Sequence, residues 1–146
     1  MHAFSRRNLE FARRISYSKG MYLHRKLESP LQEALQQFPA VLITGCRQAG
    51  KSTLLQHILK DYRYVTLDDT LVRNLAESDP ALFLNTHEPP LVLDEIQYAP
   101  QLLPALKIKI DQNRRAMGQY ALTGSQIFPL MKGVSESLAG RIAIFH

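Results

Sequence analysis

A glycine-rich pattern at residues 45–53 constrains the fold of the whole chain. The segment has the sequence GCRQAGKST and matches G-x-x-x-x-G-K-[ST]. The five residues before it, 40–44, are apolar and β-branched, which predicts a buried strand. After it, leucine and isoleucine recur at helical spacing over residues 54–59 and predict a helix. A strand, a glycine loop and a helix in this order indicate a loop that binds phosphate groups.

The residue types of this loop suit phosphate chemistry. Glycines at positions 45 and 50 let the backbone curl until successive N–H groups face one anion, and the helix that follows points its unpaired N–H groups at the same place. Lys51 would lie between the β- and γ-phosphates, and the Ser52 hydroxyl would be a Mg²⁺ ligand. Arg47 and Gln48 are expected to make backbone contacts only. The residues predicted to contact the nucleotide are Gly45, Cys46, Arg47, Gln48, Ala49, Gly50, Lys51, Ser52 and Thr53.

Composition bounds the class of protein. The chain has 146 residues, which is one domain's worth, and its hydrophobic and charged fractions are ordinary for a globular protein. The single cysteine, Cys46, excludes an internal disulfide and fits a reducing compartment, so we expect a cytoplasmic protein. The five histidines are scattered, and none stands with Cys46 at a spacing typical of zinc sites.

Residues 1–20 form a basic N-terminal extension, which we separate from a domain at 21–146. This extension holds five basic residues against one acidic residue, and it accounts for most of the net charge of +5. Three interpretations stay open for it: a flexible basic extension, an arm that contacts DNA or other phosphates, and an organelle-targeting peptide. The rest of the chain is nearly neutral and gives no argument for nucleic-acid binding.

Sequence signals place several further elements between the loop and the C-terminal half. Ser29, followed by proline and then by glutamine at position 32, predicts the start of a helix that ends before Pro39. Alternating residues predict a second strand over 63–67. Asp68 and Asp69 follow it and lie either near the nucleotide or at the cap of a helix over 70–77. Further helices are predicted from Asp79 to residue 84 and over 100–115.

A second acidic motif follows a short apolar strand. Leu91, Val92 and Leu93 precede Asp94 and Glu95, which predicts a Walker B element downstream of the phosphate loop. Asp94 would hold Mg²⁺ directly or through water, and Glu95 would orient and deprotonate the attacking water. The alternative is a strand end with two solvated carboxylates.

A further strand is predicted over 119–123, and residues 142–145 would begin a fifth. Thr123 and Ser125 lie at the end of the former strand, where a polar side chain would reach the γ-phosphate or the catalytic water. Their alternative interpretation is that of ordinary turn residues.

Six segments in order carry a resemblance to a known family. The chain resembles the predicted prokaryotic AAA-superfamily ATPases that have a further C-terminal domain of poorly known role. The resemblance covers about residues 21–146, and its motifs lie at 38–53, 67–69, 79–80, 93–100, 122–125 and 137–141.

The resemblance implies an α/β fold of the P-loop NTPase type, a three-layer sandwich. Its parallel sheet would have the order 5-1-4-3-2, with helices on both faces. It also implies ATP and Mg²⁺ as ligands, with the metal held by Ser52 and Asp94. Lys51, Glu95 and Arg141 would be catalytic residues, and Ser125 joins them from its place at the end of the strand over 119–123. Arg141 would contact the γ-phosphate in cis or from a neighbouring subunit, which implies a homo-oligomer or a partner protein that supplies an arginine. A structural ion pair is the alternative for Arg141.

The chain departs from this family in three ways. Cys46 replaces a proline and Gln126 replaces a serine, and the family continues well beyond position 146. We therefore expect a domain truncated near the fifth strand, and loss of that strand would leave the apolar edge of strand 40–44 exposed. The predicted function is ATP binding and Mg²⁺-dependent ATP hydrolysis. The alternative is a truncated nucleotide-binding remnant or an interaction module with little or no turnover.

Overall fold

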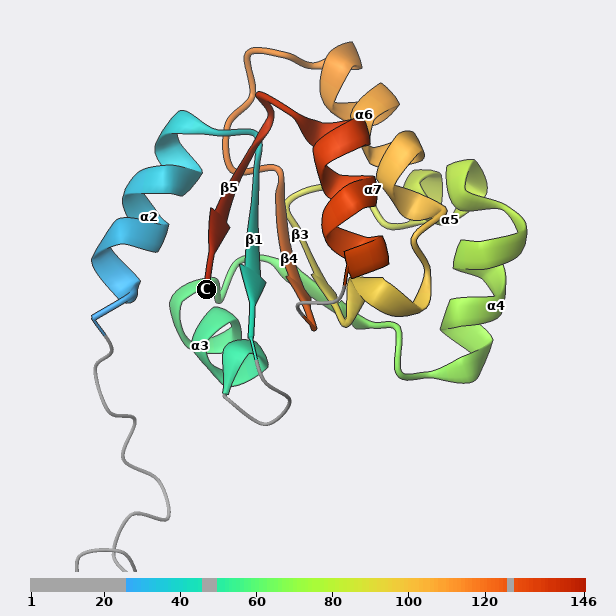
Figure 1. The fold of residues 1–146 in the computed structure, drawn as a ribbon, viewed down its shortest axis with the longest axis horizontal. Helices are drawn as coiled ribbons and strands as arrows, with labels where there is room; N and C mark the ends of the chain where they lie inside the picture. Colours follow the sequence, from blue (N-terminus) through green and yellow to red (C-terminus); the bar gives the residue numbers. More distant parts are fainter. Residues whose placement is uncertain (1–25, 46–49, 126–127) are drawn as a thin grey trace, which may run out of the picture.

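Five parallel strands form a single sheet in the order β2-β3-β4-β1-β5 (Figure 1). The computed structural model describes residues 26–45, 50–125 and 128–146. This architecture confirms the predicted α/β class and the predicted order 5-1-4-3-2. The strands are β1 (Ala40–Thr44), β2 (Arg63–Thr66), β3 (Leu91–Asp94), β4 (Tyr120–Gly124) and β5 (Ile142–Phe145).

Helices cover both faces of this sheet (Figure 1). In the part of the chain that the structure describes, two helices pack on one face, and four helices and a short 3₁₀ turn lie toward the other, as the two groups of core residues show. The first face carries α2 (Glu28–Gln37) and α3 (Lys51–Ile58); the second carries α4 (Thr70–Ser78), α5 (Pro80–Thr86), η1 (Ile96–Tyr98), α6 (Leu102–Gln112) and α7 (Phe128–Leu138). Among the described residues, no helix has the length and apolar character needed to cross a membrane.

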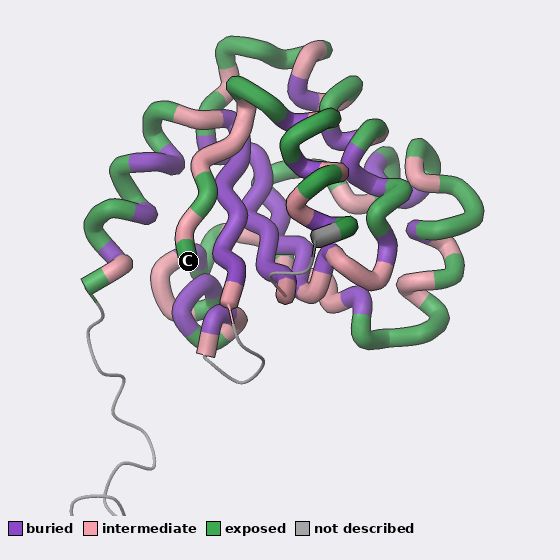
Figure 2. Tube along the Cα trace, in the orientation of Figure 1, coloured by how far each residue is buried: buried purple, intermediate pink, exposed green. Residues whose placement is uncertain are grey.

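The core lies on both sides of the central strands (Figure 2). Val41 and Ile43 of β1 pack with the leucines of α2 and α3, whereas Leu42 between them packs with α6 and α7. Strand side chains alternate between faces, so a strand buried on both sides must be apolar at nearly every position. This requirement explains the uninterrupted apolar run that precedes the phosphate loop.

The register of the strands brings three strand ends together. Ala40 of β1 pairs with Tyr120 of β4, and Thr44 pairs with Gly124. On β3, Leu93 pairs with Leu122 of β4. Because all strands are parallel, their carboxyl ends lie together. This end of the sheet holds the loop after β1, the acidic pair at the end of β3 and the end of β4, and it is where ligands bind in open α/β sheets.

The fifth strand covers the outer edge of β1. Residues 142–145 pair in parallel with residues 40–43. The fifth strand predicted to begin at residue 142 is therefore present, and its four residues pair with the edge of β1 that the loss of this strand would have exposed.

Two aspartates cap helices as the sequence predicts. The Asp69 carboxylate accepts a hydrogen bond from the N–H of Leu71 at 2.8 Å, and the Asp79 carboxylate accepts one from the N–H of Leu82 at 2.9 Å. Each satisfies an N–H group that has no partner inside its helix. Of the two interpretations of Asp69, the structure supports the helix cap.

The predicted start of α2 at a Ser29 cap is wrong. The helix begins at Glu28, Leu27 precedes it, and no side chain caps its N-terminus. Glu28 is buried and Ser29 is exposed inside the first turn. The helix therefore begins two residues earlier than its local capping signal indicates.

Candidate functional site

The phosphate loop leaves β1 at Gly45 and enters α3 at Gly50. Gly45 has φ of 148° and Gly50 has φ of 77°, values that side-chain-bearing residues rarely adopt. A Cβ at Gly45 would meet nothing within 4 Å, so its backbone conformation, and not a lack of space, requires glycine there. The predicted contact residues Cys46, Arg47, Gln48 and Ala49 lie outside the described residues.

Lys51 closes this loop from the first residue of α3. Its side chain is buried, and Nζ donates a hydrogen bond to the carbonyl oxygen of Gly45 at 3.2 Å. The hydrogen bond spans the loop from its last residues to its first. The ammonium group is thus held at the place where a phosphate bound by the loop would lie. Thr53, two residues later, is exposed.

Ser52 and Asp94, the two predicted metal ligands, meet directly. The Ser52 hydroxyl donates to Oδ1 of Asp94 at 2.5 Å, although 42 positions separate the two residues. Asp94 is buried at the end of β3, and Ser52 lies in the first turn of α3. A carboxylate and a hydroxyl beside a phosphate site are oxygen ligands of the kind that Mg²⁺ takes, so the donor set fits this ion.

Asp94 also accepts three further hydroxyl hydrogen bonds from the sheet. Thr123 donates to Oδ1 at 2.6 Å, and Tyr64 and Thr66 donate to Oδ2 at 2.7 Å and 3.3 Å. Burial and the hydrogen bond to Asp94 raise the pKa of the Tyr64 hydroxyl, so it stays protonated and acts as a donor. No sequence motif indicated a role for Tyr64 or Thr66. Their spacing of two on β2 puts both on one face, but only the pairing of β2 with β3 brings that face to Asp94.

Glu95 is held in an unusual backbone conformation by its neighbours. Its φ of 61° lies in the left-handed region, and its N–H donates to the Thr123 hydroxyl at 3.0 Å. The amide of Gln97 donates to the Glu95 carboxylate, and the amide oxygen of Gln97 accepts a hydrogen bond from the N–H of Ser125 at 3.2 Å. A Cβ at Gly124 would lie 3.1 Å from that amide oxygen, so glycine leaves room for this bridge.

The two sensor candidates at the end of β4 have different positions. The Thr123 hydroxyl is buried and bonds both Asp94 and the backbone of Glu95, so it positions the acidic pair and does not face a phosphate. Ser125 follows Gly124, which pairs with the last residue of β1 beside the phosphate loop. A role for Ser125 toward the γ-phosphate stays a prediction.

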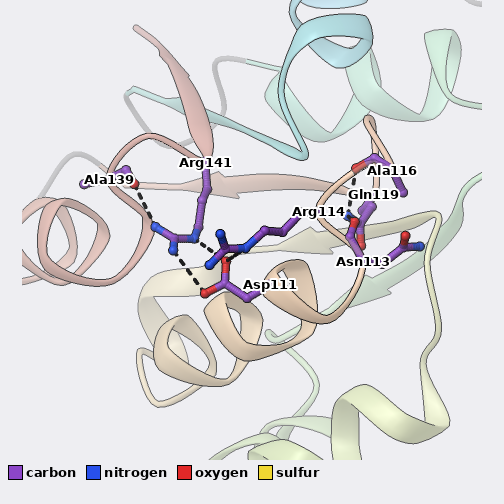
Figure 3. A network of polar contacts seen from close by, with 7 residues as sticks. All are labelled: Asp111, Asn113, Arg114, Ala116, Gln119, Ala139 and Arg141. Carbon is purple, nitrogen blue, oxygen red and sulfur yellow. Dashed lines mark hydrogen bonds and ion pairs between the residues drawn. The ribbon is translucent and has the colours of Figure 1, made fainter.

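Arg141 forms an ion pair with Asp111 of α6 (Figure 3). Its guanidinium makes two hydrogen bonds to the Asp111 carboxylate, at 2.8 Å and 3.0 Å, and a third to the carbonyl oxygen of Ala139. Its own carbonyl oxygen accepts from the N–H of Ala40, the first residue of β1. Arg141 therefore lies at the end of the sheet where the strands begin.

The phosphate loop lies at the opposite edge, the length of β1 away, which is about 13 Å at the rise of a strand. Arg141 therefore does not lie near a γ-phosphate bound by its own chain, which corrects that part of the prediction. A contact with the γ-phosphate of a neighbouring subunit stays a prediction.

Replacing Asp111 by asparagine is expected to lower the melting temperature at pH 7 by no more than a few degrees. The hydrogen bond from Arg141 holds the pKa of Asp111 below its ordinary value, but the two side chains are 25% and 27% exposed, so solvent screens the pair. A carboxylate whose pKa is depressed in the folded protein stabilises the fold at pH values above its unfolded-state pKa, which is near 4. This stabilisation is lost as the pH falls through the folded-state pKa. Thermal melts at decreasing pH should show the difference from wild type narrowing below about pH 4, whereas the exposed Asp61→Asn control should differ little throughout. An equal loss at all pH values would contradict this account.

Comparison with known proteins agrees with this geometry. The family model described as "AAA domain" matches residues 37–146, which include the phosphate loop, the acidic pair and β5. The chain belongs to this AAA domain family. Membership supports nucleotide binding through the phosphate loop, since such domains are nucleotide-binding domains.

Curated proteins similar to this chain are named as uncharacterized. Two of them, uncharacterized proteins of Mycobacterium bovis and Mycobacterium tuberculosis, are each 37% identical to this chain over 116 residues. The match covers 78% of this chain and 26% of each relative. The chain thus spans about a quarter of the length of the curated relatives it matches.

Proposed function

We propose that this AAA domain binds ATP and hydrolyses it with Mg²⁺. The observation that carries the proposal is the 2.5 Å hydrogen bond between Ser52 and Asp94, which joins the phosphate loop to the acidic end of β3. Lys51 lies at the same edge of the sheet, hydrogen-bonded across the loop. A cation for the phosphates, oxygen ligands for a metal and a neighbouring carboxylate are the groups that phosphoryl transfer to water needs.

Each of these residues has a chemical role in the proposal. Lys51 binds phosphate oxygens and offsets their charge, while Ser52 and Asp94 hold Mg²⁺, which neutralises charge on the phosphates when bound. Glu95 orients the attacking water and takes its proton. Ser125 donates a hydrogen bond toward the γ-phosphate or that water. Gln97 and Thr123 fix the backbone and the carboxylate of Glu95 between them.

ATP binding and steady-state hydrolysis by the purified chain test this proposal. We expect ATP to bind and Mg²⁺ to be required for release of phosphate. Asp94→Asn should reduce hydrolysis about 100-fold, since it removes a charge from the metal site. The exposed Asp61→Asn substitution should leave it unchanged. A folded chain that binds no ATP would refute the proposal.

A second candidate is a nucleotide-binding module that turns over little ATP by itself. The position of Arg141 favours it, because that guanidinium is paired with Asp111 at the far edge of the sheet. If a neighbouring copy supplies Arg141, hydrolysis per chain should rise with protein concentration and fall in Arg141→Ala. Hydrolysis that is independent of both would remove the arginine from the mechanism. A cytoplasmic location and DNA contact through residues 1–20 belong to the proposal on sequence grounds alone.

A further inference from the structure

The Asp94 carboxylate has its full number of hydrogen-bond donors. A carboxylate offers about four lone-pair positions on its two oxygens, and four hydroxyl groups occupy them. Ser52 and Thr123 bond Oδ1, and Tyr64 and Thr66 bond Oδ2. A metal-bound water can therefore hydrogen-bond to Asp94 only if one of these hydroxyl groups gives up its place.

The four donors are not equally free to leave. The Thr123 hydroxyl is fixed from two sides, because it also accepts the hydrogen bond of the Glu95 N–H. The Ser52 hydroxyl can donate to Asp94 and still offer a lone pair to a metal. On Oδ2 the two bonds differ in length: Tyr64 donates at 2.7 Å, whereas Thr66 donates at 3.3 Å, beyond the usual range for hydroxyl donors.

The surroundings of Tyr64 and Thr66 reinforce this difference. The Tyr64 ring packs against the core cluster beneath α2 and α3, so its hydroxyl oxygen stays within hydrogen-bond distance of Asp94 unless the ring moves. The Thr66 hydroxyl turns about a single bond, and it also accepts the N–H of Asp68 at 3.2 Å. Leaving Asp94 would cost Thr66 little, because Thr66 is partly exposed and water can accept its O–H in place of Asp94.

We propose that Tyr64 is a positioning residue that fixes the Asp94 carboxylate for Mg²⁺, and that Thr66 is the donor that yields its place to a metal-bound water. This inference rests on the proposed function of the same site. It assigns opposite contributions to two hydroxyl groups that bond the same carboxylate oxygen. Removing the Tyr64 hydroxyl should weaken metal binding, while removing the Thr66 hydroxyl should leave it equal or improve it.

Mg²⁺ titrations of nucleotide affinity test the inference without relying on hydrolysis. The probe is a fluorescent methylanthraniloyl ADP, titrated with and without Mg²⁺ into wild type, Tyr64→Phe, Thr66→Val and Tyr62→Phe. The last is the matched control: Tyr62 also donates its hydroxyl hydrogen bond, to the carbonyl oxygen of Gly118, at the opposite edge of the sheet. Thermal melts of all four proteins report folding.

In Tyr64→Phe, we expect the Mg²⁺ concentration for half-maximal effect to rise about tenfold, as for other residues that orient a metal ligand. Its metal-free affinity for the probe should be unchanged. Thr66→Val should need no more Mg²⁺ than wild type, and Tyr62→Phe should match wild type.

Several results would overturn the inference. One is an unchanged Mg²⁺ requirement in Tyr64→Phe, and another is an equal rise in Thr66→Val. A third is a loss of metal-free affinity in Tyr64→Phe, because it would place the hydroxyl in the nucleotide pocket or the fold and not in metal binding. If Tyr64→Phe does not fold, the Thr66→Val arm still decides, since a raised Mg²⁺ requirement there contradicts the assigned role. Wild type that binds no probe would refute the proposed function, and this inference with it.

Discussion

Lys51→Ala is expected to reduce ATP affinity by about 100-fold, because it removes the ammonium group that would bind the phosphate oxygens in the loop. Nζ of Lys51 bonds the carbonyl oxygen of Gly45 across the loop, and the side chain is 7% exposed. Phosphate oxygens bound there would lose a cation in a place that water screens poorly. Equilibrium binding of ATP, measured by calorimetry on both proteins, gives the ratio of dissociation constants.

Lys60→Ala is the matched control for this substitution. Lys60 is exposed just beyond the C-terminal end of α3, the helix that Lys51 begins. Its removal changes net charge by the same amount and should leave ATP affinity within about twofold of wild type. Equal losses in both variants would indicate a long-range charge effect and would remove Lys51 from direct contact with the phosphates. A melting temperature near wild type for Lys51→Ala is needed to attribute the loss to binding.

The sheet was the most predictable part of this protein. Strands β1 and β5 have the bounds predicted for them. Both are short runs of mainly apolar residues, paired with each other, and neither has a competing local signal for a helix or a turn. The order of the strands came from the family resemblance, and the structure confirms it. Periodicity alone cannot order strands, since it reports which residues are apolar and not which strands are neighbours.

Helix α7 was not predicted, for reasons that its own residues make clear. It contains Pro129 and Gly133, both of which disfavour helices in local propensity scales. Pro129 is the second residue of the helix, where a missing N–H costs little. A Cβ at Gly133 would lie 2.9 Å from Leu103 of α6, so this glycine lets the two helices pack closely. Tertiary packing decides this element.

The sequence motifs indicated the loop and the acidic residues of the candidate site but none of the contacts that support them. Motif spacing was enough to pair Ser52 with Asp94 as metal ligands, and the structure brings them into contact. It gave no signal for Tyr64, whose role depends on β2 lying beside β3. It placed Arg141 before β5 but left its partner open, and that partner, Asp111, lies 30 positions earlier on α6.

Glu95→Gln is expected to lower the rate of ATP hydrolysis by about 10²–10⁴-fold while leaving ATP affinity nearly unchanged. Glutamine has the shape of glutamate but cannot take a proton from water, and Glu95 is not bonded to Lys51, Ser52 or Asp94 in any described contact. Single-turnover hydrolysis measured beside ATP binding separates the two effects. The exposed Glu77→Gln on α4 is the matched control and should behave as wild type.

Because Thr123 holds the backbone of Glu95 and the carboxylate of Asp94 at once, Thr123→Val should impair both metal binding and hydrolysis, whereas Glu95→Gln should impair hydrolysis alone. Normal turnover in Glu95→Gln would remove Glu95 as the base and leave Asp94 as the only acidic residue of the pair with a chemical role.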